Sequence, residues 1–143
     1  MDAHVQKANF DEAFSMDSVD VEDVKKIFLT FDWDKELRLS KELQDAREQN
    51  CPVNLFVTSD ENILQLCIYD SDSSYDKYGY EAFFHYKKCS KILGLIPIVS
   101  DRMESLSVNS QSKALKMIEK FCDKNMNYFF EMIEQQKMDN RYR

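Results

Sequence analysis

Residues 53–70 read "VNLFVTSDENILQLCIYD". The two runs 53–59 and 63–70 are rich in residues that favour β-strands, and the polar residues "DEN" separate them. Two such runs joined by a short polar turn are typical of an antiparallel hairpin. The stretch therefore predicts the centre of an antiparallel β-sheet.

The residues after this hairpin predict further strands. The segment "YEAFFHYK", residues 80–87, has the composition of a third strand. The segment "ILGLIPIVS", residues 92–100, is apolar and contains Pro97, which suits an edge strand or a buried extended segment. We therefore expect three to four strands.

The last part of the chain predicts a long helix. Ser110 is a candidate N-cap, and apolar residues then recur at steps of three and four from Leu115 to Ile133. This spacing aligns them on one face of a helix, which we expect to break near Asn125.

The residues before the hairpin predict two helices. In residues 18–34, "SVDVEDVKKIFLTFDWD", apolar residues recur at helical spacing after Ser18 or Asp20, either of which can act as N-cap. Residues 27–33 also alternate as a strand would, but we predict a helix over about 20–31. A second helix follows over 35–50. We expect Asp32 or Asp34 to cap it and Leu39, Leu43 and Ala46 to face inward.

These elements together predict an α+β fold. An antiparallel sheet of three to four strands packs against N-terminal helices and a long C-terminal helix. The length suits a single domain over residues 1–143. Residues 1–17 carry one short apolar cluster at helical spacing, so we expect a loosely attached N-terminal segment with a single docked turn.

Charge is distributed unevenly along the chain, whose net charge is −7. Residues 2–36 contain ten acids and four lysines, and residues 60–81 contain six acids and one lysine. Residues 82–120 reverse the sign, with seven Lys or Arg against three acids. This balance counts against nucleic acid as a partner and favours a cationic protein. The alternative is that the charge serves solubility alone.

The four cysteines lie far apart, and no CxxC pair is present. We therefore expect free thiols, no metal site and no cofactor. The N-terminus lacks the order of a secretory signal, and no apolar run approaches the length of a membrane helix. These features predict a cytoplasmic protein that does not bind a membrane.

Catalytic motifs are missing from the sequence. It contains two histidines, no GxSxG, no glycine-rich phosphate loop and no HExxH. A Cys89–His85 nucleophile pair is disfavoured, because four residues along one strand span roughly 13 Å. We predict that the protein is not an enzyme.

The segment "DSDSSYDKYGYE", residues 70–81, admits three interpretations. Numbered as a calcium loop, it places acids at ligand positions, but Tyr75 stands where a sharp turn requires glycine. Alternatively, the segment is a solvated loop. The functional interpretation is a negative surface that contacts a partner through Asp70, Asp72 and Asp76, with Tyr75 and Tyr78 as contact area.

The element "FDWD", residues 31–34, poses a similar choice. Trp33 is either a core anchor at the start of a helix or an aromatic that faces a partner, and we predict the core. Asp32 and Asp34 are then candidate partner-binding residues beside it.

The run "VKKIFLTFDWDKELRLSKEL…CPVNLFVTSDENILQLCIYD" resembles small bacterial immunity proteins that neutralise a cognate secreted toxin. The shared features are an aromatic-rich helix ending in F-x-W, an acidic amphipathic helix, and a proline that opens a hairpin. The resemblance covers about residues 20–90. It implies a cytoplasmic, non-enzymatic protein that blocks a toxin, often a basic nuclease, by protein–protein contact.

The sequence thus predicts an immunity or inhibitor protein for bacterial competition, which binds a cationic protein toxin. The alternative is a cytoplasmic chaperone or adaptor for a secreted effector, since such proteins are also small acidic α+β domains. The oligomeric state stays open.

Overall fold

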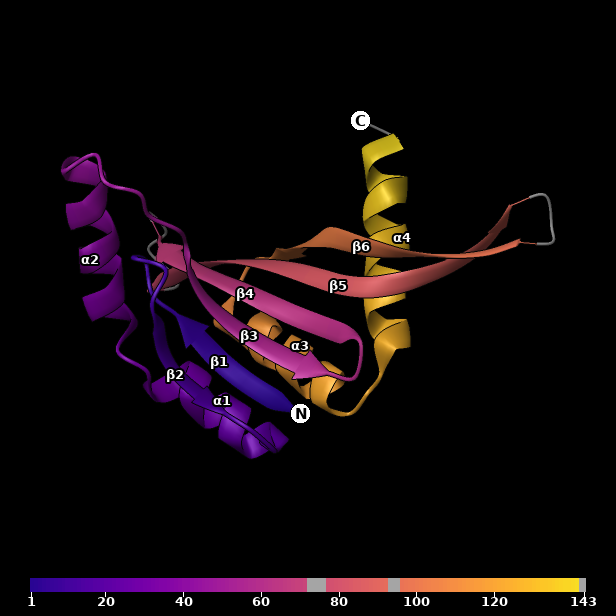
Figure 1. Cartoon of the computed structure of the whole chain (residues 1–143), viewed down its shortest axis with the longest axis horizontal. Helices are drawn as coiled ribbons and strands as arrows, with labels where there is room; N and C mark the ends of the chain where they lie inside the picture. Colours follow the sequence, from indigo (N-terminus) through magenta and orange to yellow (C-terminus); the bar gives the residue numbers. More distant parts are fainter. Residues whose placement is uncertain (72–76, 93–95, 142–143) are drawn as a thin grey trace.

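The structure is a computed structural model that describes residues 1–71, 77–92 and 96–141. Within these residues it contains a six-stranded antiparallel sheet and four helices (Figure 1). In chain order the elements are β1 (Asp2–Gln6), β2 (Glu12–Met16), α1 (Val21–Thr30), α2 (Trp33–Asp45), β3 (Val53–Ser59), β4 (Asn62–Asp70), β5 (Tyr78–Ile92), β6 (Ile96–Val108), α3 (Gln111–Cys122) and α4 (Met126–Arg141). The strands are arranged in the order β2-β1-β3-β4-β5-β6. The α+β class is therefore confirmed.

The predicted hairpin lies at the centre of this sheet. β3 and β4 pair from Val53 opposite Ile68 to Ser59 opposite Asn62. Asp60, in the turn, adopts a left-handed backbone with φ of 54°. Aspartate tolerates this conformation better than most residues, which explains why a tight turn forms here.

The predicted strand number was too low, because residues 1–17 form β1 and β2 instead of a helical turn. Val5 pairs with Leu55 of β3 on one side and with Phe14 of β2 on the other. Ala3 and Val5 point into the core, whereas His4 between them points to the opposite face. The alternation of strand residues thus decides the structure of this segment.

Helices and sheet share one hydrophobic core. The sheet contributes the inward-facing residue of every second strand position, and each helix contributes the apolar residues of one face. The largest fully buried side chains are Phe28, Phe84, Phe121, Phe129, Leu55, Leu64, Leu66, Ile68, Leu106, Met117, Ile118 and Val5. The other face of the sheet carries residues such as His4, Phe56, Gln65 and His85.

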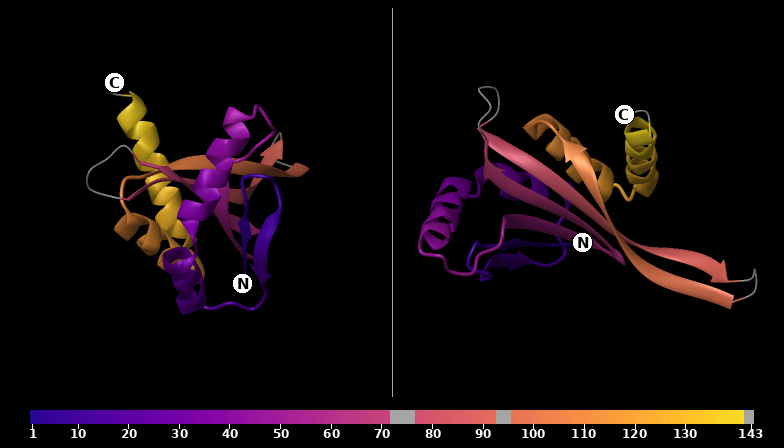
Figure 2. Two further views of the ribbon diagram at one scale, coloured as in Figure 1. Left: turned by 90° about the vertical axis from the view of Figure 1, so that its left-hand side faces the viewer. Right: turned by 90° about the horizontal axis from the view of Figure 1, so that it is seen from above.

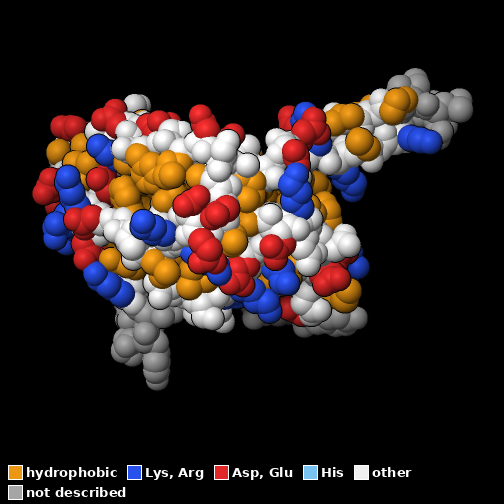
Figure 3. Space-filling view, turned by 90° about the horizontal axis from the view of Figure 1, so that it is seen from below, with side chains coloured by type: hydrophobic (Ala, Val, Ile, Leu, Met, Phe, Trp, Pro, Cys, Tyr) orange, Lys and Arg blue, Asp and Glu red, His pale blue; other side chains and the backbone are white. Residues whose placement is uncertain are grey.

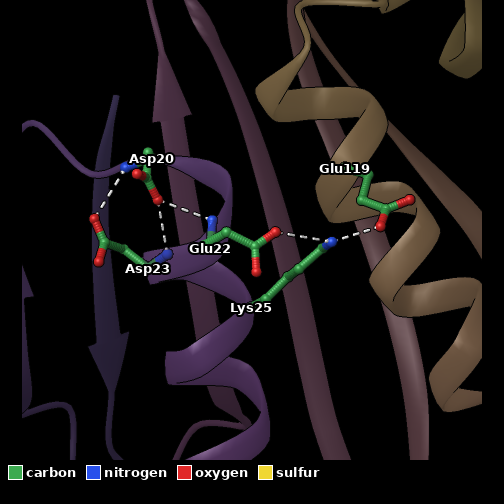
Figure 4. A network of polar contacts seen from close by, with 5 residues as sticks. All are labelled: Asp20, Glu22, Asp23, Lys25 and Glu119. Carbon is green, nitrogen blue, oxygen red and sulfur yellow. Dashed lines mark hydrogen bonds and ion pairs between the residues drawn. The ribbon is translucent and has the colours of Figure 1, made fainter.

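Helix α1 starts where the sequence predicts. The carboxylate of Asp20 accepts hydrogen bonds from the backbone N–H groups of Glu22 and Asp23, and the Asp20 N–H in turn donates to the Asp23 carboxylate (Figure 4). Lys25 of α1 forms an ion pair of 2.6 Å with Glu119 of α3. The acidic start of α1 is thereby fixed against the C-terminal helices.

The predicted long C-terminal helix is two helices. α3 ends at Cys122 and α4 begins at Met126, so the break lies at the predicted place near Asn125. Lys124 between them has a left-handed φ of 56°, which stops the helical path. In α4, the Gln136 side chain accepts a hydrogen bond of 3.4 Å from the backbone N–H of Ser107 in β6.

β5 and β6 continue as a hairpin beyond the rest of the sheet (Figures 1 and 2). β4 pairs with β5 as far as His85, whereas β5 and β6 stay paired to Ile92 opposite Ile96. We call residues 86–92 and 96–102 the arm. Seven residues of strand give it a length of roughly 20 Å.

Candidate functional site

Three of the predicted site residues, Asp34, Asp70 and Tyr78, lie at the end of the sheet where α2 begins. The Tyr78 hydroxyl donates a hydrogen bond of 2.9 Å to Oδ1 of Asp34, and Lys77 forms an ion pair with Oδ2 of the same carboxylate. Asp70, at the end of β4, pairs with Tyr78 at the start of β5. Asp34, Asp70 and Tyr78 therefore belong to one neighbourhood, although 44 residues separate Asp34 from Tyr78.

The electrostatics of this neighbourhood differ from the prediction of a free negative surface. The hydrogen bond from Lys77, followed by that from Tyr78, lowers the pKa of Asp34 below its usual value. The same contact with Asp34 raises the pKa of Lys77. Burial raises the pKa of Tyr78. Asp34 is thus ionised, but its charge is compensated by a lysine from the later half of the chain.

The other predicted site residues have separate surroundings. Asp32 is exposed and caps α2, accepting a hydrogen bond of 3.1 Å from the Lys35 N–H. Asp72, Tyr75 and Asp76 lie outside the described residues.

Trp33 occupies the core, as predicted. It is 3% exposed, and its indole Nε1 donates a hydrogen bond of 2.8 Å to the carbonyl oxygen of Phe28. Its ring lies 4.6 Å from that of Phe31, measured between centroids. The aromatic residue of "FDWD" therefore anchors the α1–α2 corner, and the two aspartates beside it remain at the surface.

A groove that the sequence did not predict lies between β2 and α1. Its volume is about 500 Å³. It is lined by Phe14, Met16, Asp23, Lys26, Ile27, Thr30, Phe31 and Asp32. Because β2 is the outermost strand of the sheet, one wall of the groove is a sheet edge. We call this feature the acidic groove.

The acidic groove joins apolar surface to negative charge. Met16 is 41% exposed beside Phe14, and Asp23 and Asp32 form no ion pair within the described residues. In the view from below, which faces α1, hydrophobic side chains form an exposed patch with acidic side chains at its margins (Figure 3). Lys26 is the basic residue of the lining.

The charge of the chain is concentrated in the segment that builds this groove. Residues 1–32 contain eight acids and three lysines, whereas residues 33–143 contain eighteen acids and sixteen Lys or Arg. Of the three lysines, Lys25 is engaged by Glu22 and Glu119 (Figure 4). The acid count of residues 2–36 is the sequence signal that points to this face. The groove itself could not be inferred, because it depends on β2.

The open face of the sheet carries a ladder of polar side chains. Asn54 Oδ1 accepts hydrogen bonds from Gln65 and from the Cys67 thiol, and Gln65 Oε1 lies 3.1 Å from His85 Nε2. Burial raises the pKa of the Cys67 thiol to about 11 and lowers the pKa of His85. At neutral pH this thiol is protonated, so the ladder does not supply a thiolate nucleophile.

Asp70 and Glu81, the first and last residues of the calcium-loop pattern, lie on opposite faces of the sheet. Asp70 pairs with Tyr78 and Glu81 pairs with Cys67, and successive strand residues alternate between faces. These two carboxylates therefore do not converge on one ion. Among the residues that the structure describes, no cluster of three or more His, Cys, Asp or Glu side chains has the arrangement of a metal site.

Comparison with known proteins finds no match for this chain among protein families, curated proteins or solved structures. In the described part of the chain, no helix has both the length and the apolar character needed to cross a membrane.

Proposed function

We propose that the chain is a non-enzymatic inhibitor, of the immunity-protein kind, that binds a cationic protein toxin in the acidic groove. The observation that carries the proposal is the combination, in one groove, of exposed apolar side chains with carboxylates that have no basic partner among the described residues. Asp32 belongs both to the surface expected from the sequence and to this groove.

The mechanism follows from the two kinds of surface. Long-range attraction between the acidic segment 1–32 and a basic partner accelerates their encounter. Apolar side chains of the partner then fill the space beside Phe14 and Met16, which supplies contact that salt does not screen. The outer edge of β2 also presents backbone groups to which an extended segment can add as a further strand.

The candidate toxin is the product of the gene next to that of this chain. This product would be purified and its binding to the chain measured directly. The variant Asp23→Asn/Asp32→Asn removes two negative charges from the groove. It keeps side chains that can still cap helices α1 and α2. We expect slower association, and a weaker dependence of the association rate on salt, in surface-based kinetic measurements.

A matched control is Asp139→Asn combined with Glu131→Gln, which removes the same charge from exposed positions of α4. This control should associate with the toxin at nearly the wild-type rate. Equal association rates for the groove variant and the wild-type chain would overturn the assignment of the groove. Failure of the wild-type chain to suppress the toxin's activity would overturn the inhibitor proposal itself.

The second candidate is a chaperone or adaptor for a secreted effector. Among the described residues no strand lies beyond β2, and this edge beside the acidic groove favours the second candidate, because such an edge suits an unfolded, extended segment. Binding of an unfolded effector segment, with no binding of a folded partner, would support this candidate over the inhibitor.

A further inference from the structure

The arm has the opposite charge to the acidic groove. It carries Lys87, Lys88, Lys91 and Arg102 against Asp101. Lys87 forms an ion pair with Glu61, whereas Lys88, Lys91 and Arg102 form none within the described residues. The arm therefore offers three basic side chains without an acidic partner, on a chain whose net charge is −7.

The arm also exposes apolar side chains and backbone edges. Cys89 and Val99 pair across the two strands, and both are exposed, Val99 to 58%. Beyond His85 the outer edge of β5 has no strand beside it in the described residues, and β6 is the last strand of the sheet. A two-stranded ribbon with both edges in water is marginally stable and prone to further pairing.

The arm and the acidic groove cannot meet within one molecule. They lie at opposite ends of the sheet order, and the arm projects away from β2 and α1 (Figures 1 and 2). Direct pairing of two arms is opposed by the repulsion of their basic side chains. The complementary surface that the chain itself provides is therefore the acidic groove of another copy.

We propose that the arm of one copy of this chain docks against the acidic groove of a second copy. Lys91 and Val99 lie on the same face of the arm and turn toward the groove, whereas Lys88, on the other face, adds to the positive charge beside the acidic segment 1–32, and an arm strand lies along the edge of β2. Val99 supplies an apolar side chain for the groove floor at Phe14 and Met16. Two copies placed side by side in opposite directions make this contact twice, which closes the assembly as a symmetric dimer.

This inference uses the same groove as the proposed function, but it requires no foreign partner. Self-association would cover the groove, so a toxin and the arm would compete for it. Self-association of the purified chain is measured without a toxin, so its outcome is independent of whether the proposed function is correct.

The decisive experiment is sedimentation velocity on the purified full chain over a range of protein concentrations, at low and at high salt. We expect reversible association of the wild-type chain that weakens as salt is added. The arm variant Lys88→Glu/Lys91→Glu and the β2 variant Glu12→Lys/Asp17→Lys, which reverses two charges beside the groove, should each associate at least about ten-fold more weakly, because each places like charges opposite each other. Glu12, the first residue of β2, and Asp17, the residue after the strand, are exposed, as are Lys88 and Lys91, so both variants should fold normally.

Mixing the two variants gives the sharpest result. Each alone opposes like charges, whereas the mixture offers a basic arm to an acidic groove and an acidic arm to a basic groove. We therefore expect the mixture to associate at close to the wild-type affinity. The control Lys41→Glu/Arg47→Glu, at exposed positions at and just beyond the end of α2, makes the same change in net charge as the arm variant and should associate normally.

A wild-type chain that stays monomeric at every concentration would overturn the inference. So would an arm variant that associates as strongly as the wild-type chain, or a variant mixture that does not recover. Co-sedimentation of a monomeric wild-type chain with vesicles of anionic phospholipid would assign the basic arm to a lipid surface instead.

Discussion

The hydroxyl of Tyr78 donates a hydrogen bond to Asp34, which links the first turn of α2 to the first residue of β5. Lys77, the residue before Tyr78, engages the second carboxylate oxygen of Asp34. Both oxygens of one aspartate are therefore used by two consecutive residues at the start of a distant strand, Lys77 just before β5 and Tyr78 as its first residue. The contact fixes α2 against the end of the sheet, beside the exposed Asp32.

This contact predicts a dependence of stability on acid pH. Because its folded-state pKa lies below the usual 3.8, ionised Asp34 stabilises the fold above that pH, and the contribution is lost as pH falls through the lowered value. Asp34→Asn should lower the urea midpoint at pH 7, and the difference from wild type should shrink below pH 3.8. Unfolding followed by Trp33 fluorescence tests this. Asp139→Asn, on the exposed end of α4, should leave the midpoint unchanged.

His85 predicts a second dependence of stability on pH, which comes from a basic side chain instead of a carboxylate. Burial lowers its pKa below 6.5, so the folded state favours the neutral ring. The contribution of neutral His85 to the stability of the fold is fully present above pH 6.5. It declines as the pH falls from that value toward the folded-state pKa. The decline should be smaller in His85→Gln than in the wild-type chain, whereas His4→Gln should retain it. An NMR titration of the His85 ring that gives an ordinary or raised pKa would contradict the prediction.

Truncation of Phe84, at the aromatic centre of the core, should cause a large loss of stability. Phe84 is fully buried, and its ring stacks on Phe129 with centroids 4.7 Å apart. Phe84→Ala should lower the free energy of unfolding by about 3–5 kcal/mol, through lost burial and the cavity left behind. Met138→Ala, at a residue that is 50% exposed, should change it by less than about 0.5 kcal/mol. Denaturant unfolding followed by circular dichroism measures both changes.

Glu36 predicts a gain in stability. It is 4% exposed, and its Oε2 has no hydrogen-bond partner in the described part of the chain. A buried polar atom without a partner costs about 1–3 kcal/mol, so Glu36→Met should raise the free energy of unfolding by about 1 kcal/mol or more. Glu42→Met, on the exposed side of the same helix, is the matched control and should have little effect. A loss of stability in Glu36→Met alone would show that the carboxylate is stabilised where it lies.

The sequence predicts best those elements whose signals are local. The β-favouring runs in 53–70 with their polar turn predict the hairpin of β3 and β4, and Asp20, one of the two candidate caps, marks the start of α1. Ser110 similarly predicts the start of α3. In each case the residues that determine the element lie within a few positions of one another.

The elements that were mispredicted depend on distant contacts. β1 and β2 are five residues each, and β1 becomes a strand by pairing with β3, which lies about fifty positions later. In α2, Leu39 and Leu43 were expected to face inward with Ala46, which is in fact exposed. Leu43 is partly buried against the core, as expected, but the fully buried residues of α2 are Trp33, Glu36 and Leu37 near its start, and the helix packs against β3 and β4.

The candidate site shows the same division. The concentration of acids before residue 36 was visible in the sequence, and it marks the face that contains the groove. The pairing of Asp34 with Lys77 was not visible, because nothing local relates residues 43 positions apart. The groove likewise depends on the packing of β2 beside α1, and the sequence predicted the helix over about 20–31 but not the strand β2.

The hydrogen bond from the Ser107 N–H to Gln136 makes the two edges of the sheet, β6 and β2, differ in their ability to pair with a further strand. Helix α4 packs against β6 and accepts a hydrogen bond from one backbone N–H on its outer edge, whereas no element beyond β2 is present among the described residues. A further strand is therefore expected to add at β2 in preference to the part of β6 beside α4. An added strand meets an unobstructed edge at β2, whereas at the part of β6 beside α4 it would have to compete with the Gln136 side chain.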